Sequence, residues 1–332
     1  MRRLIGAALA LLVLVLLAGG GALLAWRRLD TPGPLQTARA VVVPRGGLDQ
    51  VADALAAEGV VAHPLELRLA AFATRRDGAL HAGELQFPAR ASLRQVLQVL
   101  RTAKPMQHKL TIPDGLTAAQ VATLLERGEA LTGDPVLPDE GSLLPETYLY
   151  DRGTTRAALS ARAKAAMDRA LAAAWAGRAP DLPLASPEEA LILASLVEQE
   201  TARPEERPHI AAVYLNRLRQ GMKLQSDPTV VYAVTGGLGA LDRPLSRADL
   251  DLDNPYNTYH YAGLPPGPIA LPSLAAIEAV VRPIESDDLY FVADGTGGHA
   301  FARTEDEHRQ NVARWRQIER ARAAAGRSAA SP

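Results

Sequence analysis

Cysteine is absent from this chain of 332 residues. Its absence excludes a disulfide framework, a metal site with thiolate ligands, a thiol nucleophile and a lipid-modified N-terminal cysteine. It does not decide between a reducing and an oxidising compartment, because proteins without cysteine occur in both.

An excess of charge of either sign is also missing. The 36 basic and 37 acidic residues give a formal net charge of −1. This balance provides no electrostatic reason to expect nucleic acid as a partner. The length allows about two domains, and a hydrophobic content of 48% is enough for a sizeable core.

Several catalytic and binding motifs are absent as well. The seven histidines include no H-x-x-x-H or H-E-x-x-H spacing, and no G-x-S-x-G nucleophile motif occurs. The glycines of 236–239 lack the lysine and the strand-to-helix context of a phosphate-binding loop. We therefore expect no metal and no cofactor, which leaves carboxylate chemistry as the main option.

One long uncharged run, Leu4 to Trp26, stands near the N-terminus between two pairs of arginines. At about 1.5 Å per residue, a helix of this length reaches roughly 34 Å and could cross a bilayer. A cleaved signal peptide is the alternative, but its apolar core is usually about 7–15 residues long. We expect a single-pass transmembrane anchor at 4–26, with residues 1–3 as a short cytoplasmic tail.

The rest of the chain predicts an α+β fold class with two domains. Val41–Val43 reads as a strand, two helical patterns follow, and Glu84–Phe87 reads as a returning strand. This order resembles a LysM-like fold, which in cell-wall proteins implies contact with glycan; a plain structural spacer is the alternative. The predicted parts are a linker at 27–39, a LysM-like small α+β domain at 40–104, a mixed α/β catalytic domain at 105–320 and a flexible tail at 321–332.

The centre of the predicted catalytic domain is an apolar helical run, Leu191–Val197, that ends in two glutamates. Glu198 and Glu200 are two residues apart, so on a helix their side chains point about 200° away from each other. They cannot both face one cleft. One could be catalytic while the other is solvated or paired, for example with Arg203 or Arg217.

Other carboxylates, Asp227 and Glu146, could fold toward the same cleft. A proton donor for glycoside cleavage needs a pKa raised by apolar surroundings, and a glutamate at the mouth of an apolar helix fits that need. An ordinary exposed helix-end glutamate is the alternative. The loop at 253–272 is rich in proline and glycine yet holds several tyrosines, a combination found in sugar-binding loops and in purely structural ones.

Local signals also predict elements near the ends of this domain. Ser186 followed by Pro187 is a helix start. Residues 289–292 and 299–301 read as strands of a hairpin around Asp294–Gly298. Thr304 and Glu307 have the spacing of a capping box for the last helix.

Six ordered blocks resemble the endolytic murein transglycosylase (YceG-like) family. They are LLPETY (Leu143–Tyr148), ASLVEQET (Ala194–Thr201), VYLNRL (Val213–Leu218), GMKLQSDPTVVYA (Gly221–Ala233), YNTYHYAGLPPGPIA (Tyr256–Ala270) and YFVADGTGGHAF (Tyr290–Phe301). The resemblance implies an N-terminal membrane anchor, a LysM-like region and a catalytic domain outside the cytoplasmic membrane. It also implies cleavage within nascent peptidoglycan strands, which terminates their growth.

In the family pattern the catalytic acid is the second glutamate of the V-E-x-E-T block, here Glu200. The resemblance implies that Glu200 protonates the oxygen between N-acetylmuramic acid and N-acetylglucosamine. The 6-hydroxyl of the muramic acid then closes a 1,6-anhydro ring, with neither water nor cofactor. Candidates for orienting the sugar are Gln225, Asp227, Asn257 and Tyr259, with Glu146 as a further one. Leu271 stands where the family often has asparagine, so no sugar contact is expected there.

Two other functions stay open from the residues. A true muramidase would need a second carboxylate about 5–9.5 Å from the acid, and Asp227 or Glu146 could supply it. A non-catalytic, membrane-anchored scaffold would use only the anchor and the LysM-like region. Expected partners are peptidoglycan strands, membrane lipid around the N-terminal helix and peptidoglycan synthases. The expected location is the cytoplasmic (inner) membrane, with the catalytic domain on its periplasmic side.

Overall fold

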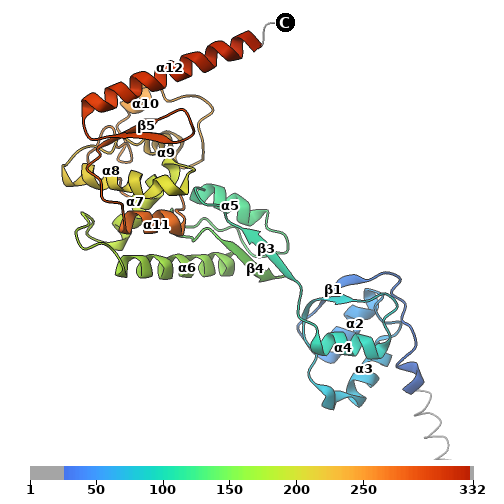
Figure 1. The fold of residues 1–332 in the computed structure, drawn as a ribbon. Helices are drawn as coiled ribbons and strands as arrows, with labels where there is room; N and C mark the ends of the chain where they lie inside the picture. Colours follow the sequence, from blue (N-terminus) through green and yellow to red (C-terminus); the bar gives the residue numbers. More distant parts are fainter. Residues whose placement is uncertain (1–25, 330–332) are drawn as a thin grey trace, which may run out of the picture. The chain divides into compact units, whose positions relative to one another are not determined.

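The computed structural model describes residues 26–329, and the chain divides into two compact units (Figure 1). The first contains the residues up to His108 together with Tyr150–Gly153, and the second contains Lys109–Leu149 and the residues from Thr154 onward. The boundary passes through a two-stranded sheet of β3 (Gln107–Thr111) and β4 (Thr147–Asp151).

The first unit is a small α+β fold around one strand pair. Its elements are β1 (Arg39–Val43), α2 (Leu48–Ala57), α3 (Pro64–Ala73), the 3₁₀ turn η1 (Arg75–Asp77), β2 (Gly83–Phe87) and α4 (Leu93–Thr102). β1 and β2 are antiparallel, with Val41 opposite Leu85. Val41 and Val43 are buried while Val42 between them is 50% exposed, as the alternation of side chains along a strand requires. The predicted order of strand, helix, helix and strand is confirmed.

The second unit is mainly helical. Its remaining elements are α5 (Ala118–Glu126), α6 (Arg156–Ala176), α7 (Pro187–Glu200), η2 (Pro204–Glu206), α8 (Arg207–Arg219), α9 (Asp227–Thr235), α10 (Arg247–Leu250), α11 (Leu274–Val281), β5 (Tyr290–Ala293), β6 (His299–Ala302) and α12 (Glu305–Ala329).

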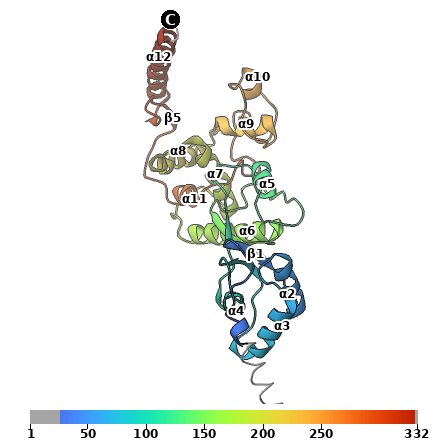
Figure 2. The same ribbon diagram turned by 90° about the vertical axis from the view of Figure 1, so that its right-hand side faces the viewer.

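Helix α7 is the core of this unit. It begins as predicted, with the Ser186 hydroxyl accepting a hydrogen bond from the Glu189 amide and with Pro187 in the first turn. Its middle turns are buried on all sides, because α6, α8 and α11 pack around it (Figures 1 and 2). A helix enclosed in this way cannot rotate, so the side chains at its C-terminal end have fixed directions.

The hairpin of β5 and β6 follows α11. The strands are antiparallel, with Ala293 opposite His299, as the turn signal predicts. The Asp294 carboxylate closes the turn by accepting hydrogen bonds from the amide and hydroxyl of Thr296 and from the Gly298 amide. The predicted capping box at the start of α12 is also confirmed, because the Thr304 hydroxyl and the Glu307 carboxylate each accept from the other residue's amide.

The fold class predicted from the sequence requires one correction. Among residues 26–329, no helix has both the length and the apolar character needed to cross a membrane. The described residues therefore form a mixed α/β architecture with no membrane-spanning helix among them. The stretch expected to form that helix, Leu4 to Trp26, lies outside the described residues except for Trp26 itself.

Candidate active site

Glu200 is the last residue of α7, and two hydroxyl groups hold one of its carboxylate oxygens. Oε1 accepts a short hydrogen bond from the hydroxyl of Tyr214 on α8. It also accepts one from the hydroxyl of Ser226, the residue before α9, at 2.5 Å. Oε2 makes no hydrogen bond with the described residues. One oxygen is thus fixed, while the other is available to a ligand.

The surroundings of Glu200 favour the protonated acid. Burial is the largest influence and raises the pKa of Glu200. The hydrogen bonds from Ser226 and Tyr214 oppose this rise, the negative charge of Asp227 adds to it, and the charge of His299 opposes it. The net pKa is above the usual glutamate value, which suits a group that must donate a proton near neutral pH.

Asp227 and Tyr259, both predicted site residues, lie together beside Glu200. The Tyr259 hydroxyl donates a hydrogen bond to Asp227 Oδ1 at 2.6 Å. Burial and this bond raise the pKa of Tyr259, so it stays a donor. The neighbouring Thr258 accepts from the Ser226 amide through its hydroxyl at 3.0 Å. The tyrosine-rich loop is therefore joined to the segment that carries Ser226 and Asp227.

Asn257, predicted to contact sugar, lies fully buried within the same loop. Its Nδ2 donates to the carbonyl oxygens of Leu250 and Leu252 at 3.0 and 2.8 Å. Its Oδ1 accepts from the Tyr259 amide at 3.0 Å. Both polar atoms of the side chain are thus used inside the protein, where they hold the loop that presents Tyr259.

Of the other two predicted sugar contacts, Gln225 lies next to the site and Glu146 does not. Gln225 adjoins the site in a left-handed backbone conformation, with φ of +52°, which is uncommon for any residue but glycine. Its Oε1 accepts a hydrogen bond from Arg217 at 3.5 Å. Glu146 is exposed just before β4, and it shares no hydrogen bond or ion pair with the Glu200 group among the residues described. The structure does not bring Glu146 to the site.

Glu198, the other glutamate at the end of α7, is bound by partners inside the protein. Its side chain is 4% exposed, and Oε1 accepts from Arg207 at 2.6 Å. Oε2 accepts from the amide of Ser273 at 2.8 Å and from the Ser273 hydroxyl, at the start of α11. The prediction that the two glutamates face different surroundings is confirmed. The partners suggested for the second one, Arg203 or Arg217, were wrong, because Arg207 takes that place.

The comparison with known proteins assigns the family. The model of the YceG-like family matches residues 41–314. The chain belongs to the YceG-like family.

Named relatives match part of this YceG-like chain. An endolytic murein transglycosylase of Streptococcus pneumoniae is 41% identical over 181 residues, which cover 52% of this chain and 32% of the relative. An endolytic murein transglycosylase of Bacillus subtilis is 45% identical over 118 residues, or 36% of this chain and 32% of that protein. The chain thus aligns with about a third of the length of these relatives. The crystal structure of a putative yceG-like protein from Listeria monocytogenes matches with a TM-score of 0.52 and 26% identity, covering 82% of this chain and 98% of that one.

Two of the groups that hold Glu200 were not predicted. Tyr214 lies in an apolar helical pattern and reads as a core residue, and Ser226 reads as a loop residue next to the more conspicuous Asp227. The sequence signal for both was their place inside the family blocks, since their distances from Glu200 along the chain are 14 and 26 residues.

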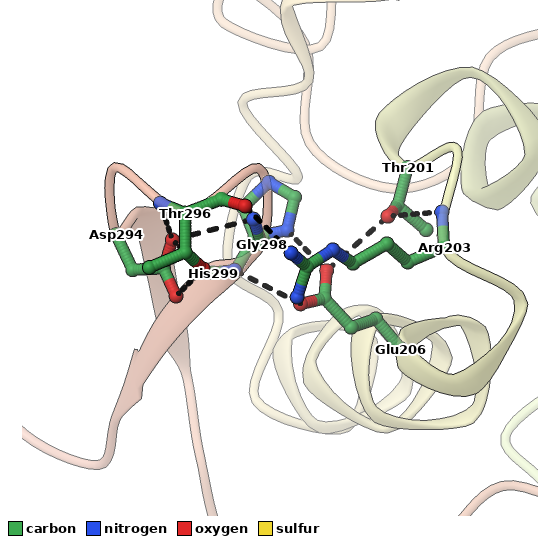
Figure 3. Close-up of polar contacts among 7 residues, drawn as sticks. All are labelled: Thr201, Arg203, Glu206, Asp294, Thr296, Gly298 and His299. Atoms are coloured by element: carbon green, nitrogen blue, oxygen red, sulfur yellow. Dashed lines mark hydrogen bonds and ion pairs between the residues drawn. The ribbon is translucent and has the colours of Figure 1, made fainter.

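The segment that follows Glu200 in this YceG-like chain is fastened to the β5–β6 hairpin (Figure 3). The Glu206 carboxylate accepts hydrogen bonds from the Thr201 hydroxyl at 3.2 Å, from His299 Nδ1 at 2.7 Å and from the His299 amide at 3.0 Å. Arg203 donates to the Thr296 carbonyl at 2.6 Å. The sequence predicted the hairpin but not this attachment.

A cavity of about 430 Å³ opens beside the site, within the size range of ligand pockets. Residues of several elements line it, among them Thr117, Gln120, Gln199, Asp227, Tyr232 and Ile269. No lysine or arginine of the described chain lines it. The lining combines two carboxylates, Asp114 and Asp227, with amide, hydroxyl and aromatic groups, all of which can bond or stack on a sugar ring.

Proposed function

We propose that this chain is an endolytic lytic transglycosylase that cleaves peptidoglycan strands between N-acetylmuramic acid and N-acetylglucosamine. The observation that carries the proposal is Glu200, a carboxyl group whose pKa is raised by burial and whose Oε2 makes no hydrogen bond with the described residues. Membership of the YceG-like family and the names of the two relatives support the same substrate.

The reaction needs one acid that later acts as a base. Protonated Glu200 donates its proton to the glycosidic oxygen, and the bond between this oxygen and C1 of the muramic acid breaks. The 6-hydroxyl oxygen of the same sugar bonds to the oxocarbenium-like C1, and its proton passes to the Glu200 carboxylate. The product has a 1,6-anhydro end, and no water is consumed. A single carboxylate suffices because the nucleophile is internal and already aligned.

The surrounding groups fit this cycle. Tyr214 and Ser226 donate hydrogen bonds to Glu200, and such bonds stabilise the carboxylate that exists between the two proton transfers. Asp227 favours the protonated form through its charge. The sugar next to the cleaved bond is proposed to enter the cavity lined by Gln199, Asp227 and Tyr232.

A muramidase is the competing enzyme, because Asp227 is close enough for its charge to affect Glu200. A hydrolase would use this second carboxylate to activate water or to attack C1. Digestion of peptidoglycan in heavy-oxygen water distinguishes the two enzymes by product mass. Transglycosylation leaves unlabelled 1,6-anhydro ends, whereas labelled reducing ends would refute the proposed reaction.

The substitution Glu200→Gln tests the catalytic role of this residue. It should abolish formation of anhydro ends, because the amide cannot donate the proton. The exposed Glu205→Gln provides a matched control five residues away and should retain wild-type activity. If the folded Glu200→Gln protein shortened glycan strands as wild type does, a non-catalytic peptidoglycan-binding scaffold would be the better description.

The site of action is proposed to lie outside the cytoplasm, because assembled peptidoglycan is found there, and peptidoglycan synthases are proposed as partners. Protease added to cells with an opened wall should digest the second unit. Complete protection would contradict this location.

The proposed synthase partner is tested by cross-linking in growing cells. Cross-linking should recover a synthase, and its consistent absence would count against that partner.

A further inference from the structure

His299 is the first residue of β6, and aromatic rings hold its side chain in place. Its ring meets Phe291 edge to face, with centroids 5.3 Å apart, and lies 6.4 Å from the ring of Phe301. Phe291 in turn meets Tyr214 edge to face at 5.7 Å. A row of packed rings therefore leads from His299 to the tyrosine that donates to Glu200.

Glu206 determines which nitrogen of His299 carries hydrogen. Burial raises the pKa of Glu206, but the hydrogen bonds from the side chain and amide of His299 outweigh it, and the net pKa is lowered. An ionised carboxylate can only accept hydrogen bonds. The hydrogen therefore lies on Nδ1, 2.7 Å from Glu206 Oε2. In the neutral ring Nε2 is then an acceptor.

The other ring nitrogen of His299, Nε2, is the atom that can meet a ligand. It makes no hydrogen bond with the described residues, and it is not one of the buried polar atoms without a partner. The atom is therefore reachable by solvent or by a ligand. The ring also lies near enough to Glu200 that a positive charge on the protonated ring would lower the pKa of that carboxyl group.

We propose that His299 is a glycan-binding residue, whose Nε2 accepts a hydrogen bond from a hydroxyl or acetamido N–H of the sugar held at Glu200. Glu206 acts through His299 by fixing its orientation and its tautomer. The inference rests on the proposed function for its ligand class, because sugars of peptidoglycan carry both kinds of donor.

The close approach of the hairpin supports a precise placement of the ring. A Cβ atom at Gly298 would lie 2.3 Å from Glu206 Oε1 and 2.7 Å from the Arg203 guanidinium, so a larger residue would force these two side chains to move. Arg203 holds the Thr296 carbonyl of the same turn (Figure 3). The contacts of Glu206 with His299 and of Arg203 with Thr296 both join the hairpin to the segment directly after Glu200. The positions of the His299 ring and of Glu200 are therefore fixed by the same segment.

Two substitutions separate the role of Nε2 from the role of the Glu206 contact. In His299→Asn the amide nitrogen replaces Nδ1 and can still donate to Glu206, but nothing replaces Nε2. In His299→Gln the amide oxygen reaches the place of Nε2, while the Glu206 contact is lost. Loss of one hydrogen bond to substrate corresponds to about a three- to tenfold loss of affinity.

We expect His299→Asn to raise KM for glycan strands about three- to tenfold with kcat little changed, as for a contact made equally in the bound and transition states. His299→Gln should keep KM within about twofold of wild type. His209→Gln is the matched control, because His209 contacts Asp288 through Nε2 at 2.7 Å and the glutamine amide nitrogen can take that place. It should leave KM unchanged. A wild-type KM in His299→Asn, or an equal rise in both His299 variants, would overturn the proposal.

Binding without turnover keeps this inference separate from the proposed reaction. Full-length Glu200→Gln protein is titrated with chitotetraose, with and without His299→Asn. A dissociation constant three- to tenfold weaker in the double variant supports the glycan contact even if the wild-type chain forms no anhydro ends. Equal affinities, or no binding of chitotetraose at all, would overturn the contact whatever the reaction proves to be.

Discussion

Glu198→Gln should destabilise the second unit, whereas Glu200→Gln should not. Glu198 and Arg207 are 4% and 9% exposed and lie 2.6 Å apart. Breaking a buried ion pair by removing one charge costs about 3–5 kcal/mol. Within residues 26–329, Arg207 Nε already lacks a hydrogen-bond partner, and the Asp114 carboxylate is 3.9 Å from Arg207 and half exposed. Glutamine can still accept from Ser273, so we expect the lower end of the range, about 3 kcal/mol.

The opposite expectation at Glu200 follows from its raised pKa. A carboxyl group whose folded pKa lies above the unfolded value of 4.5 binds more protons in the native state. Its contribution to stability therefore falls as pH rises from 4.5 through the folded pKa, by about 1.4 kcal/mol for each pH unit of that window. Glutamine cannot ionise, so at pH 7 the Glu200→Gln variant should be at least as stable as wild type.

Thermal unfolding measured by tryptophan fluorescence tests both expectations, because Trp175 and Trp315 lie in the second unit. For a unit of roughly 200 residues, about 3 kcal/mol corresponds to a fall in Tm of about 6–12 °C. A Glu198→Gln variant that unfolds within about 1 °C of wild type would refute the reasoning. So would a Glu200→Gln variant that is the less stable of the two at pH 7.

Three further outcomes follow from the site. Asp227→Asn removes a charge that raises the pKa of Glu200, so the alkaline limb of the pH–rate profile should move to lower pH; an unmoved limb would contradict this. Ser226→Ala removes a hydrogen bond that lowers the same pKa, so that limb should move to higher pH in the same assay. Gly298→Ala places a Cβ 2.3 Å from the Glu206 carboxylate, and calorimetry should show a loss of about 1–3 kcal/mol; wild-type stability would show that the side chains of Glu206 and Arg203 can move aside.

Elements with local signals were predictable from the sequence. The start of α7 depends on Ser186 and Pro187, and the hairpin depends on the turn at Asp294–Gly298. In each case the interactions that decide the structure lie within a few residues of one another. The opposed environments of Glu198 and Glu200 were predictable for the same reason, because helix geometry alone determines their directions.

The partners of those side chains were not predictable, because they depend on how helices pack. Arg207 pairs with Glu198 because the short turn η2 reverses the chain and places the first residue of α8 beside the end of α7. Arg217 is ten residues further along α8 and donates to the carbonyls of Leu289 and Leu224.

Asn257 was predicted to contact sugar because it is polar, and the structure shows why polarity alone is not enough for such a prediction. The loop at 253–272 contains no helix or strand, so its backbone carbonyls lack the partners that regular structure supplies. The Asn257 amide supplies such a partner at the start of the loop, by donating to the carbonyls of Leu250 and Leu252 at the end of α10. A polar residue in such a loop is therefore as readily required by the backbone as by a ligand.

The hydrogen bonds at Glu200 also determine where its proton lies. Oε1 already accepts from the hydroxyls of Tyr214 and Ser226. A carboxyl oxygen that accepts two donors has no lone pair in a favourable direction for a proton. In the neutral acid the proton must therefore lie on Oε2, which has no partner among the described residues. The same oxygen regains negative charge after it protonates the glycosidic oxygen, and so it is also the atom that takes the proton from the 6-hydroxyl. The two proton transfers of the proposed reaction thus use one atom and require no rotation of the Glu200 carboxylate between them.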